Sequence, residues 1–369
     1  MVAVRMMAHD KAKLVGTTLG VVFAVVLAGQ QVGVLLGLLQ KNTMFADNAG
    51  ADIWVVPPAT TQTAPGQRLP TALLEQARTT PGVSVASPLV MVGTAIKKPG
   101  GGSEAITLVG FDLDTGLGGP WNIVAGSVDE LRRRDTIFFE DAQREKAGGL
   151  NLGSVREVNG RSVRIGGFTW GLLPFGPPYS FGDIDTVREL GDVSRDELSF
   201  VLVKVAPGAD VAAVQDELAR RMPTAEVVTR HELHDTIVET LLAEQLGITF
   251  GTSTAFGLII GFVIVALSMF SAVIDNLREF GTLKAIGLTN SDLGRMLVVQ
   301  SIAYAWFGSL VGLGLVAGLS EGIRSANLVI LLPAPLVLAV PAVMTILCVM
   351  ASALALRRVR RLEPGMVFR

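Results

Sequence analysis

Two histidines near residue 231 have the types and spacing of side chains that can bind a metal ion. His231 and His234 stand three residues apart, with Glu232 and Asp235 beside them. Imidazoles at that spacing on a helix can face one ion. The polar part of the chain offers no third histidine, no cysteine and no H-E-x-x-H motif. We therefore interpret these residues as solvated polar side chains and predict no metal site.

Motifs for catalysis or nucleotide binding do not occur in the sequence. It has no G-x-x-x-x-G-K-[ST] loop to hold phosphate groups, and no nucleophile, base and orienting group can be assembled from it. We expect a non-catalytic subunit that binds no cofactor and no nucleic acid. Any energy source must then be another subunit.

A segment rich in glycine, proline and aromatic residues, 167–183, suggests a contact surface. Its aromatic residues are Phe168, Trp170, Phe175, Tyr179 and Phe181. They can pack together as loop structure, or they can form an exposed apolar contact for a partner or a lipid-like substrate. The last four are the candidate contact residues.

Four long apolar stretches must position these residues. The stretches are 14–39, 248–274, 296–319 and 328–356. Each has the roughly 20 residues that a helix needs to cross a bilayer, and none has a charged side chain in its interior. One precedes a long polar block and three follow it. We therefore predict an α-helical membrane protein with four transmembrane helices in a 1 + 3 layout.

The first stretch has a competing interpretation as a secretory signal peptide. Its apolar run is longer than the roughly 7 to 15 residues of a signal core, and Gln40-Lys41-Asn42 is not a small-residue cleavage site. We favour a retained helix, so that residues 1–41 comprise a cytoplasmic segment and the first span.

Charge predicts the orientation of the chain. Residues 42–247 hold 27 acidic and 18 basic side chains, although the whole chain has a net charge of only −2. Basic residues precede the first stretch, occur in the 275–295 loop and form a tail at 357–369. Because cytoplasmic segments are enriched in Lys and Arg, we expect both termini and this loop inside and the polar block outside.

The polar block predicts a large extracytoplasmic α/β domain. Strands are expected at 51–56, 83–96, 105–111, 136–139, 154–158, 162–166, 199–205 and 226–229, and helices at 71–78 and 211–221. The simplest assembly has two subdomains within residues 42–230. One combines 42–102 with 196–230, and the other is a strand-rich insertion, 103–195.

A helical pattern follows the outer domain. Leu233, Ile237 and Leu241 lie on one stripe, and only Gly247 separates this segment from the second apolar stretch. We favour a rigid stalk that continues into the membrane, so that 231–274 is one segment. The alternative is an ordinary last helix of the outer domain followed by a loop.

The cytoplasmic loop 275–295 predicts a short amphipathic helix. Its apolar positions are Leu277, Phe280, Leu283 and Ile286. Charges lie between them, as in helices that lie on a membrane surface. Thr289 and Asp292 resemble a capping box that starts the next helix.

The third apolar stretch contains glycines at G-x-x-x-G spacing, Gly308 with Gly312 and Gly314 with Gly318. Small residues at this spacing let helix backbones approach closely. We favour helix packing within the chain over a specific dimer seam.

The loop resembles a known family. R-E-F-G-T-L-K-A-I-G at 278–287 is similar to the coupling segment of the FtsX/MacB superfamily of ABC transporter permeases, the type VII or mechanotransmission class. The tail 357–369 and the 1 + 3 layout are also similar. Residues 9–13, 23–33 and 51–55 resemble the DevC-type branch.

This resemblance implies a homodimer in the bacterial inner membrane, with two copies of a separate cytoplasmic ATPase that uses ATP and Mg. The outer part 42–102 with 196–230 would be porter-like. Relatives act on lipids, glycolipids, lipoproteins, peptides or drugs, often with a periplasmic membrane-fusion adaptor and an outer-membrane channel. The resemblance thus implies an exporter permease that transmits motion through its stalks.

The resemblance also implies ATPase-contact residues. They are Arg278, Glu279, Phe280, Leu283, Lys284 and Ile286. Phe280 and Leu283 would fill a groove on the ATPase, and Glu279 and Lys284 would fix the orientation at its rim.

Two other functions stay open. One is an FtsX-like regulator that activates a cell-wall hydrolase outside the cell without transport, although outer domains of that type tend to be smaller. The other is a receptor or peptide sensor, which would still need a signalling partner because only a loop and short tails lie inside.

Overall fold

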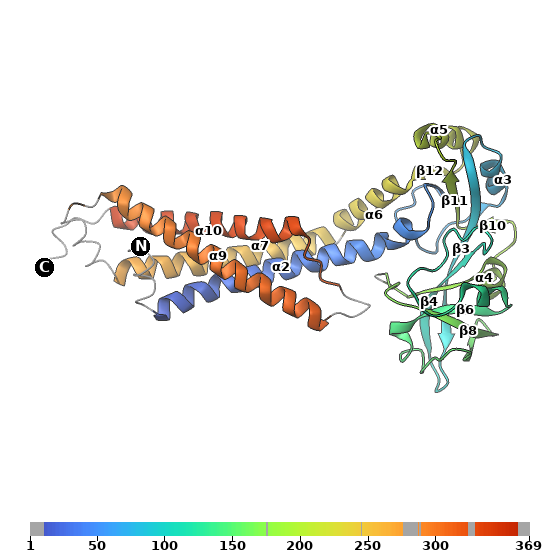
Figure 1. Ribbon diagram of the computed structural model, residues 1–369, viewed down its shortest axis with the longest axis horizontal. Helices are drawn as coiled ribbons and strands as arrows, with labels where there is room; N and C mark the ends of the chain where they lie inside the picture. The colour runs from blue at the N-terminus through green and yellow to red at the C-terminus, as the bar shows by residue number, and fades with distance from the viewer. Residues whose placement is uncertain are drawn as a thin grey trace. The chain divides into compact units, whose positions relative to one another are not determined.

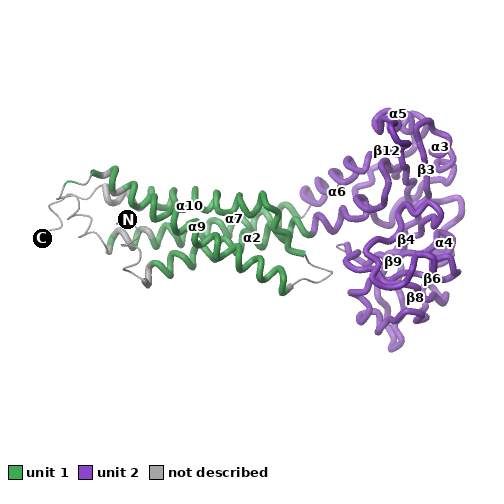
Figure 2. The backbone as a smooth tube through the Cα atoms, viewed as in Figure 1, with its two compact units in different colours: residues 1–37, 245–324, 329–369 green, residues 38–244, 325–328 purple. Residues whose placement is uncertain are grey.

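The computed structural model describes residues 11–174, 176–244, 246–275, 287, 289–323 and 329–360. The chain divides into two compact units, coloured separately in Figure 2. Unit 1 comprises residues 1–37, 245–324 and 329–369, and unit 2 comprises residues 38–244 and 325–328.

Four long helices account for the four apolar stretches, and the fourth helix begins at Ala334, later than the predicted start at residue 328 (Figure 1). They are α2 (Lys11–Asn48), α7 (Leu246–Asp275), α9 (Asn290–Ile323) and α10 (Ala334–Arg360). Each is long and apolar enough to cross a membrane. The prediction of four apolar helices is therefore confirmed. The last residues of α2, from Leu38 on, belong to unit 2.

Glycines let the helices of unit 1 pack closely. A methyl group added at Gly261 would lie 2.2 Å from the Cβ atom of Ala24, so α7 and α2 meet without side chains between them. A methyl group at Gly308 of α9 would likewise lie 2.5 Å from Val21 of α2. Gly314 and Gly318 have no other group within 4 Å of such a methyl. The first G-x-x-x-G pair thus packs within the chain, as small residues do in membrane helices.

Unit 2 is built on a ten-stranded mixed sheet. Its strands are β1 (Ile53–Val56), β3 (Val83–Lys97), β4 (Ser103–Phe111), β5 (Ile123–Gly126), β6 (Thr136–Glu140), β7 (Val155–Val158), β8 (Arg161–Thr169), β9 (Tyr179–Asp183), β11 (Phe200–Val205) and β12 (Glu226–Thr229). The order is β12-β1-β11-β3-β4-β9-β6-β8-β5, and β7 pairs with β3 and β8. A separate ribbon joins β2 (Leu69–Pro70) to β10 (Glu197–Leu198).

The long strand β3 connects the two parts of this sheet. Its residues from Val83 to Leu89 pair with β11, and those from Leu89 to Lys97 pair with β4. The two expected subdomains therefore share one continuous set of strands. Their division at residues 103 and 195 stays a prediction.

Both faces of the sheet are covered, because apolar side chains alternate along the strands. In β1, Ile53 and Val55 belong to one buried cluster, and Trp54 and Val56 belong to the other. The first cluster includes residues of α3 (Ala72–Arg78), α4 (Ile184–Gly191) and α5 (Val211–Arg221). The second includes residues from the end of α2 and from α6 (Arg230–Glu244). Two short 3-10 turns, Val128–Arg132 and Asp141–Gln143, complete the unit.

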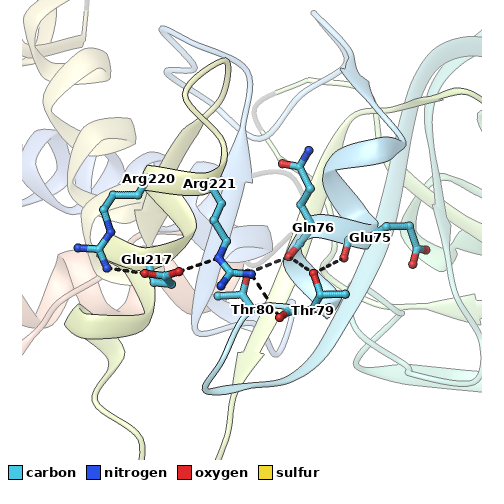
Figure 3. A network of polar contacts seen from close by, with 7 residues as sticks. All are labelled: Glu75, Gln76, Thr79, Thr80, Glu217, Arg220 and Arg221. Carbon is cyan, nitrogen blue, oxygen red and sulfur yellow. Dashed lines mark hydrogen bonds and ion pairs between the residues drawn. The ribbon is translucent and has the colours of Figure 1, made fainter.

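A polar network joins the ends of α3 and α5 (Figure 3). The guanidinium of Arg221 donates to Glu217 at 2.7 Å and to the carbonyl oxygen of Thr79 at 3.3 Å. The hydroxyl of Thr80 donates to the carbonyl oxygen of Gln76 at 2.8 Å and so closes the last turn of α3. The contacts of Arg221 lie at the surface, where each contributes little to stability, whereas Thr80 is buried.

Candidate functional site

The chain enters and leaves unit 2 on one face of the sheet. Phe45, near the end of α2, and Leu233 and Ile237, in α6, belong to the same buried cluster. We call the contacts that hold the end of α2 and the helix α6 on the sheet the anchor. Its residues are Lys41, Phe45, Asp47, Glu140 and His234. All five belong to unit 2.

Phe45 is the apolar centre of the anchor. Its ring is fully buried, and the centroids of four other aromatic rings lie within 6.5 Å of its own. These rings belong to Trp54, Trp121, Tyr179 and Phe181. Pairs of this kind each contribute about 0.5–1.5 kcal/mol beyond the area that they bury. The end of α2 is thereby fixed to β1 and β9.

Lys41 and Glu140 hold the turn between β8 and β9 from two sides. The Nζ atom of Lys41 donates to the carbonyl oxygen of Gly171 at 2.6 Å. The carboxylate of Glu140, at the end of β6, accepts from the backbone N–H groups of Gly171 at 2.7 Å and Leu172 at 3.0 Å, and from Thr169 Oγ1 at 3.2 Å. Gly171 has a φ of 82°, a conformation that suits glycine. This turn therefore links α2 to the sheet.

The side chain of Glu140 has no exposed surface, and this burial has the largest effect on the pKa of its carboxyl. Loss of hydration raises the pKa of this carboxyl, and the hydrogen bonds from Gly171, Leu172 and Thr169 act in the opposite direction. A buried carboxylate is tolerated only where donors surround it, as they do here. Glu140 thus serves to shape the turn.

A second polar contact joins α6 to α2. The Nδ1 atom of His234 lies 3.1 Å from Oδ1 and 3.2 Å from Oδ2 of Asp47. Both side chains are about one-third exposed. This contact connects the two helices directly, beside the apolar cluster.

The other residues of the H-E-L-H-D segment shape the start of α6. Glu232 accepts from the backbone N–H of Thr229 at 2.7 Å, and its own N–H donates to Thr229 Oγ1 at 3.2 Å, which is a capping box. The hydrogen bond from the backbone N–H of Thr229 lowers the pKa of the Glu232 carboxyl. The side chain of His231 is 87% exposed. Within the described residues, no three metal-binding side chains gather here.

The structure separates the four aromatic residues that were candidate contacts. Tyr179 and Phe181 are buried around Phe45, so the hypothesis of an exposed contact is corrected for these two. They belong to β9, and their alternation directs both rings to the face that α2 covers. Trp170 is 47% exposed. Phe175 lies outside the described residues.

The predicted stalk stripe packs within unit 2, against the sheet. Leu233 and Ile237 are buried, and Leu241 packs at the margin of the same cluster. Helix α6 ends at Glu244 and α7 begins at Leu246. The intervening Gln245 is outside the described residues, so a stalk that continues into α7 stays a prediction.

The six predicted ATPase-contact residues, between Arg278 and Ile286, also lie outside the described residues. The capping box predicted after them is confirmed. The carboxylate of Asp292 accepts from the Thr289 N–H at 3.0 Å, and the Asp292 N–H donates to Thr289 Oγ1 at 3.3 Å, at the start of α9. The cytoplasmic role of the loop stays a prediction.

Family comparisons agree with the four helices and the outer domain. The family model described as MacB-like periplasmic core domain matches residues 14–221, more than half of the chain, and that described as FtsX-like permease C-terminal matches residues 251–364.

Relatives of similar length have been found. An uncharacterized ABC transporter permease of Mycobacterium tuberculosis is 24% identical over 357 residues, which cover 95% of this chain and 93% of the relative. Another from the same species is 23% identical over 375 residues, covering 99% and 98%. The solved periplasmic region of MacB from Actinobacillus actinomycetemcomitans is 11% identical, with a TM-score of 0.39, and covers 55% of this chain and 97% of that one.

The two family matches cover the first span with the outer domain and then the last three helices, in the order in which the structure has them. Permeases of this type consist of membrane helices with a periplasmic domain and work with a cytoplasmic ATPase. The chain therefore belongs to the FtsX/MacB family of ABC transporter permeases.

Proposed function

We propose that this chain is the permease subunit of an ABC exporter in which a separate ATPase, present in two copies, moves the outer domains of a permease homodimer. Both termini and the 275–295 loop face the cytoplasm in this proposal, and unit 2 lies outside the inner membrane. The movement drives export or extraction of a lipid-like, glycolipid, peptide or drug substrate.

The anchor supports this proposal. The end of α2 and the helix α6 are the two chain segments that connect residues 49–229 to the apolar helices. Both pack in one cluster with β1 and β9, and His234 contacts Asp47 directly. Because a packed cluster transmits displacement instead of absorbing it, a shift of either helix reaches the sheet.

The coupling loop supplies the other end of the proposed path. Phe280 and Leu283 would insert into the ATPase, as apolar residues at the centre of an interface do, and the charged neighbours would orient them. Closure of the ATPase dimer would then displace α7 and α9. Neither helix needs to form a channel for the substrate.

The test uses the full chain with the ATPase encoded beside it, purified together and reconstituted in liposomes. Phe280→Asp should abolish association and the permease-dependent ATP hydrolysis. Thr282→Asp adds the same charge in the same loop, off the apolar stripe, and should retain both. The coupling assignment fails if Phe280→Asp leaves association and ATP-driven activity unchanged.

The same preparation distinguishes export from regulation. Recovery of a periplasmic adaptor with the full chain, and release of a substrate that depends on ATP, would support export. Recovery of a peptidoglycan hydrolase whose activity rises with ATP hydrolysis would instead identify an FtsX-like regulator.

A further inference from the structure

Two helices on opposite faces of the sheet meet around its edge at β12. Helix α5 packs on one face through Leu218, and α6 packs on the other through Leu233. In the order of the sheet β12 is a terminal strand, and side chains from both helices reach it. The edge of the sheet is therefore a place where the two helices can be joined.

Gln215 of α5 and Glu232 of α6 bond to this strand and to each other. The Nε2 atom of Gln215 donates to the carbonyl oxygen of Val227 at 3.1 Å and to Oε2 of Glu232 at 2.6 Å. The same oxygen of Glu232 accepts from the backbone N–H of Thr229 at 2.7 Å. We call these contacts the clasp, and its residues are Gln215, Val227, Thr229 and Glu232.

The backbone groups in the clasp belong to the outer edge of β12. Val227 and Thr229 are two residues apart, so their backbone groups point to the same side of the strand. Because these groups bond to Gln215 and Glu232, that side faces away from β1, the strand with which β12 pairs. The clasp thus covers an edge that could otherwise pair with another strand.

A glutamine at position 215 suits these acceptors. Its amide nitrogen has two N–H donors, and a carbonyl oxygen and a carboxylate oxygen both lie within hydrogen-bond distance of it. The hydrogen bond to the carboxylate is charge-assisted, which makes it stronger than a bond between two neutral groups. One side chain of α5 thus holds both β12 and the start of α6.

The clasp lies where the sheet passes directly into α6. The strand β12 ends at Thr229 and α6 begins at Arg230, with no loop between them. Glu232 is in the first turn of α6, so its contact with Gln215 fixes that turn from the side of α5. The anchor holds the same helix on its own face of the sheet, through His234 and the apolar cluster. Helix α6 is therefore held from both sides of the sheet.

We propose that Gln215 is a positioning residue for α6, which acts through Glu232 so that α5, β12 and the first turn of α6 move as one body. In a transport cycle a displacement of α6 would then reach α5, on the face of the sheet that α6 does not cover. That consequence rests on the proposed function, in which the ATPase displaces α6. The fixed geometry of the clasp does not, and it can be measured in the permease alone.

The test measures the distance between α5 and α6 in the full chain, in nanodiscs of phosphatidylcholine. The only cysteine is removed by Cys348→Ala, and nitroxide spin labels are attached at two exposed positions, Ala219→Cys of α5 and Glu239→Cys of α6. Pulsed electron–electron double resonance then gives the distribution of distances. Gln215→Met has a side chain of similar length without N–H donors, so it should make this distribution roughly twice as broad. Gln215→Lys retains N–H donors and should keep the distribution narrow.

Gln76→Met is the matched control. Gln76 is an exposed glutamine of α3, and within the described residues its side chain makes no hydrogen bond, so this variant should leave the distribution unchanged. Equal widths for the wild-type protein and Gln215→Met would overturn the proposal. It would also be overturned if the distribution of Gln215→Lys were as broad as that of Gln215→Met, because lost donors would then not be the cause.

Addition of the ATPase and ATP separates this inference from the proposed function. If ATP displaces α6, the distance between the labels should stay constant in the wild-type protein and change in Gln215→Met. A change in the wild-type protein would show that α5 and α6 do not move as one body and would overturn the proposal. If ATP affects neither protein, the exporter function loses support, while the widths measured without ATP still decide the role of Gln215.

Discussion

Units 1 and 2 place their large apolar side chains in opposite ways. In unit 1 the leucines Leu267, Leu310 and Leu338 are each at least 68% exposed, and close helix contacts are made at glycines. In unit 2 large side chains such as Trp54 and Phe45 are fully buried. In lipid, burying a large apolar side chain gains no hydrophobic free energy, so helices pack where small residues let their backbones approach. In water, the hydrophobic effect drives the large apolar side chains into the core.

The largest effect that tests this contrast is expected at Phe45. Phe45→Ala removes a fully buried ring and should destabilise unit 2 by about 3–5 kcal/mol. Phe23→Ala, in the same helix but at a position that is 48% exposed, should change stability far less. Hydrogen exchange of the β1 and β9 amides in the full chain measures both. Equal losses of protection for the two variants would contradict the contrast.

The second prediction concerns packing by size in unit 1. Gly308→Ala puts a methyl group 2.5 Å from Val21 and should cost about 1–3 kcal/mol through overpacking. Gly314→Ala has open space and serves as the control. Thermal unfolding of the detergent-solubilised chain should show a lower midpoint only for the first variant. A midpoint that is unchanged for Gly308→Ala would mean that the helices can separate freely at this crossing.

The third prediction is a pH dependence of unit 2. Burial raises the pKa of Glu140, so between the ordinary carboxyl pKa of 4.5 and the higher folded-state pKa the folded protein binds more protons than the unfolded chain. The stability contributed by this group is therefore lost as pH rises through the folded-state pKa. Glu140→Gln cannot ionise and should lack this slope, which is at most about 1.4 kcal/mol per pH unit. Hydrogen exchange of the β6 amides is measured between pH 4.5 and 8 and corrected for the intrinsic exchange rate. It gives the change of stability with pH for the wild-type protein and for Glu140→Gln.

The smallest effect on stability is expected at the contact between α6 and α2. His234→Gln should cost roughly 0.2–1 kcal/mol, because the pair with Asp47 is partly exposed. His231→Gln is the control, since that side chain is 87% exposed. Urea unfolding of the full chain, followed by hydrogen exchange of the β1 and β9 amides, compares the stability of the two variants. A loss above 2 kcal/mol would show that the polar contact, and not the aromatic cluster, holds the two helices together.

Local patterns predicted much of the fold. The helix α5 and the strand β12 have the predicted bounds, because Asp210 caps the helix and short apolar runs are bounded by turn residues. The strand β9 and the helix α4 were not predicted. Tyr179–Asp183 lies among glycines and prolines and becomes a strand through parallel pairing with β4 and antiparallel pairing with β6, both far away in the sequence. No local pattern encodes such a partner.

The anchor was beyond sequence reasoning for a related reason. Phe45 follows the first apolar stretch, which was predicted to end at residue 39, and nothing in its local sequence indicates that its ring lies in the core of unit 2. Lys41 and its acceptor Gly171 are 130 residues apart. A weak signal did exist at Glu140, a carboxylate that directly follows a buried apolar strand. Only the tertiary fold shows which groups surround that carboxylate.

The pairing of β1 also constrains the synthesis of the protein. Both of its neighbours, β11 and β12, are made late, since Ile53 pairs with Val203 and Thr229. At about 5–20 residues per second, the first strand waits on the order of ten seconds or more for its partners. During that interval Ile53 to Val56 is an unpaired apolar segment, already translocated if the domain lies outside. An unpaired apolar strand is prone to aggregate, so a chaperone that covered Ile53 to Val56 in this interval would raise the yield of folded permease.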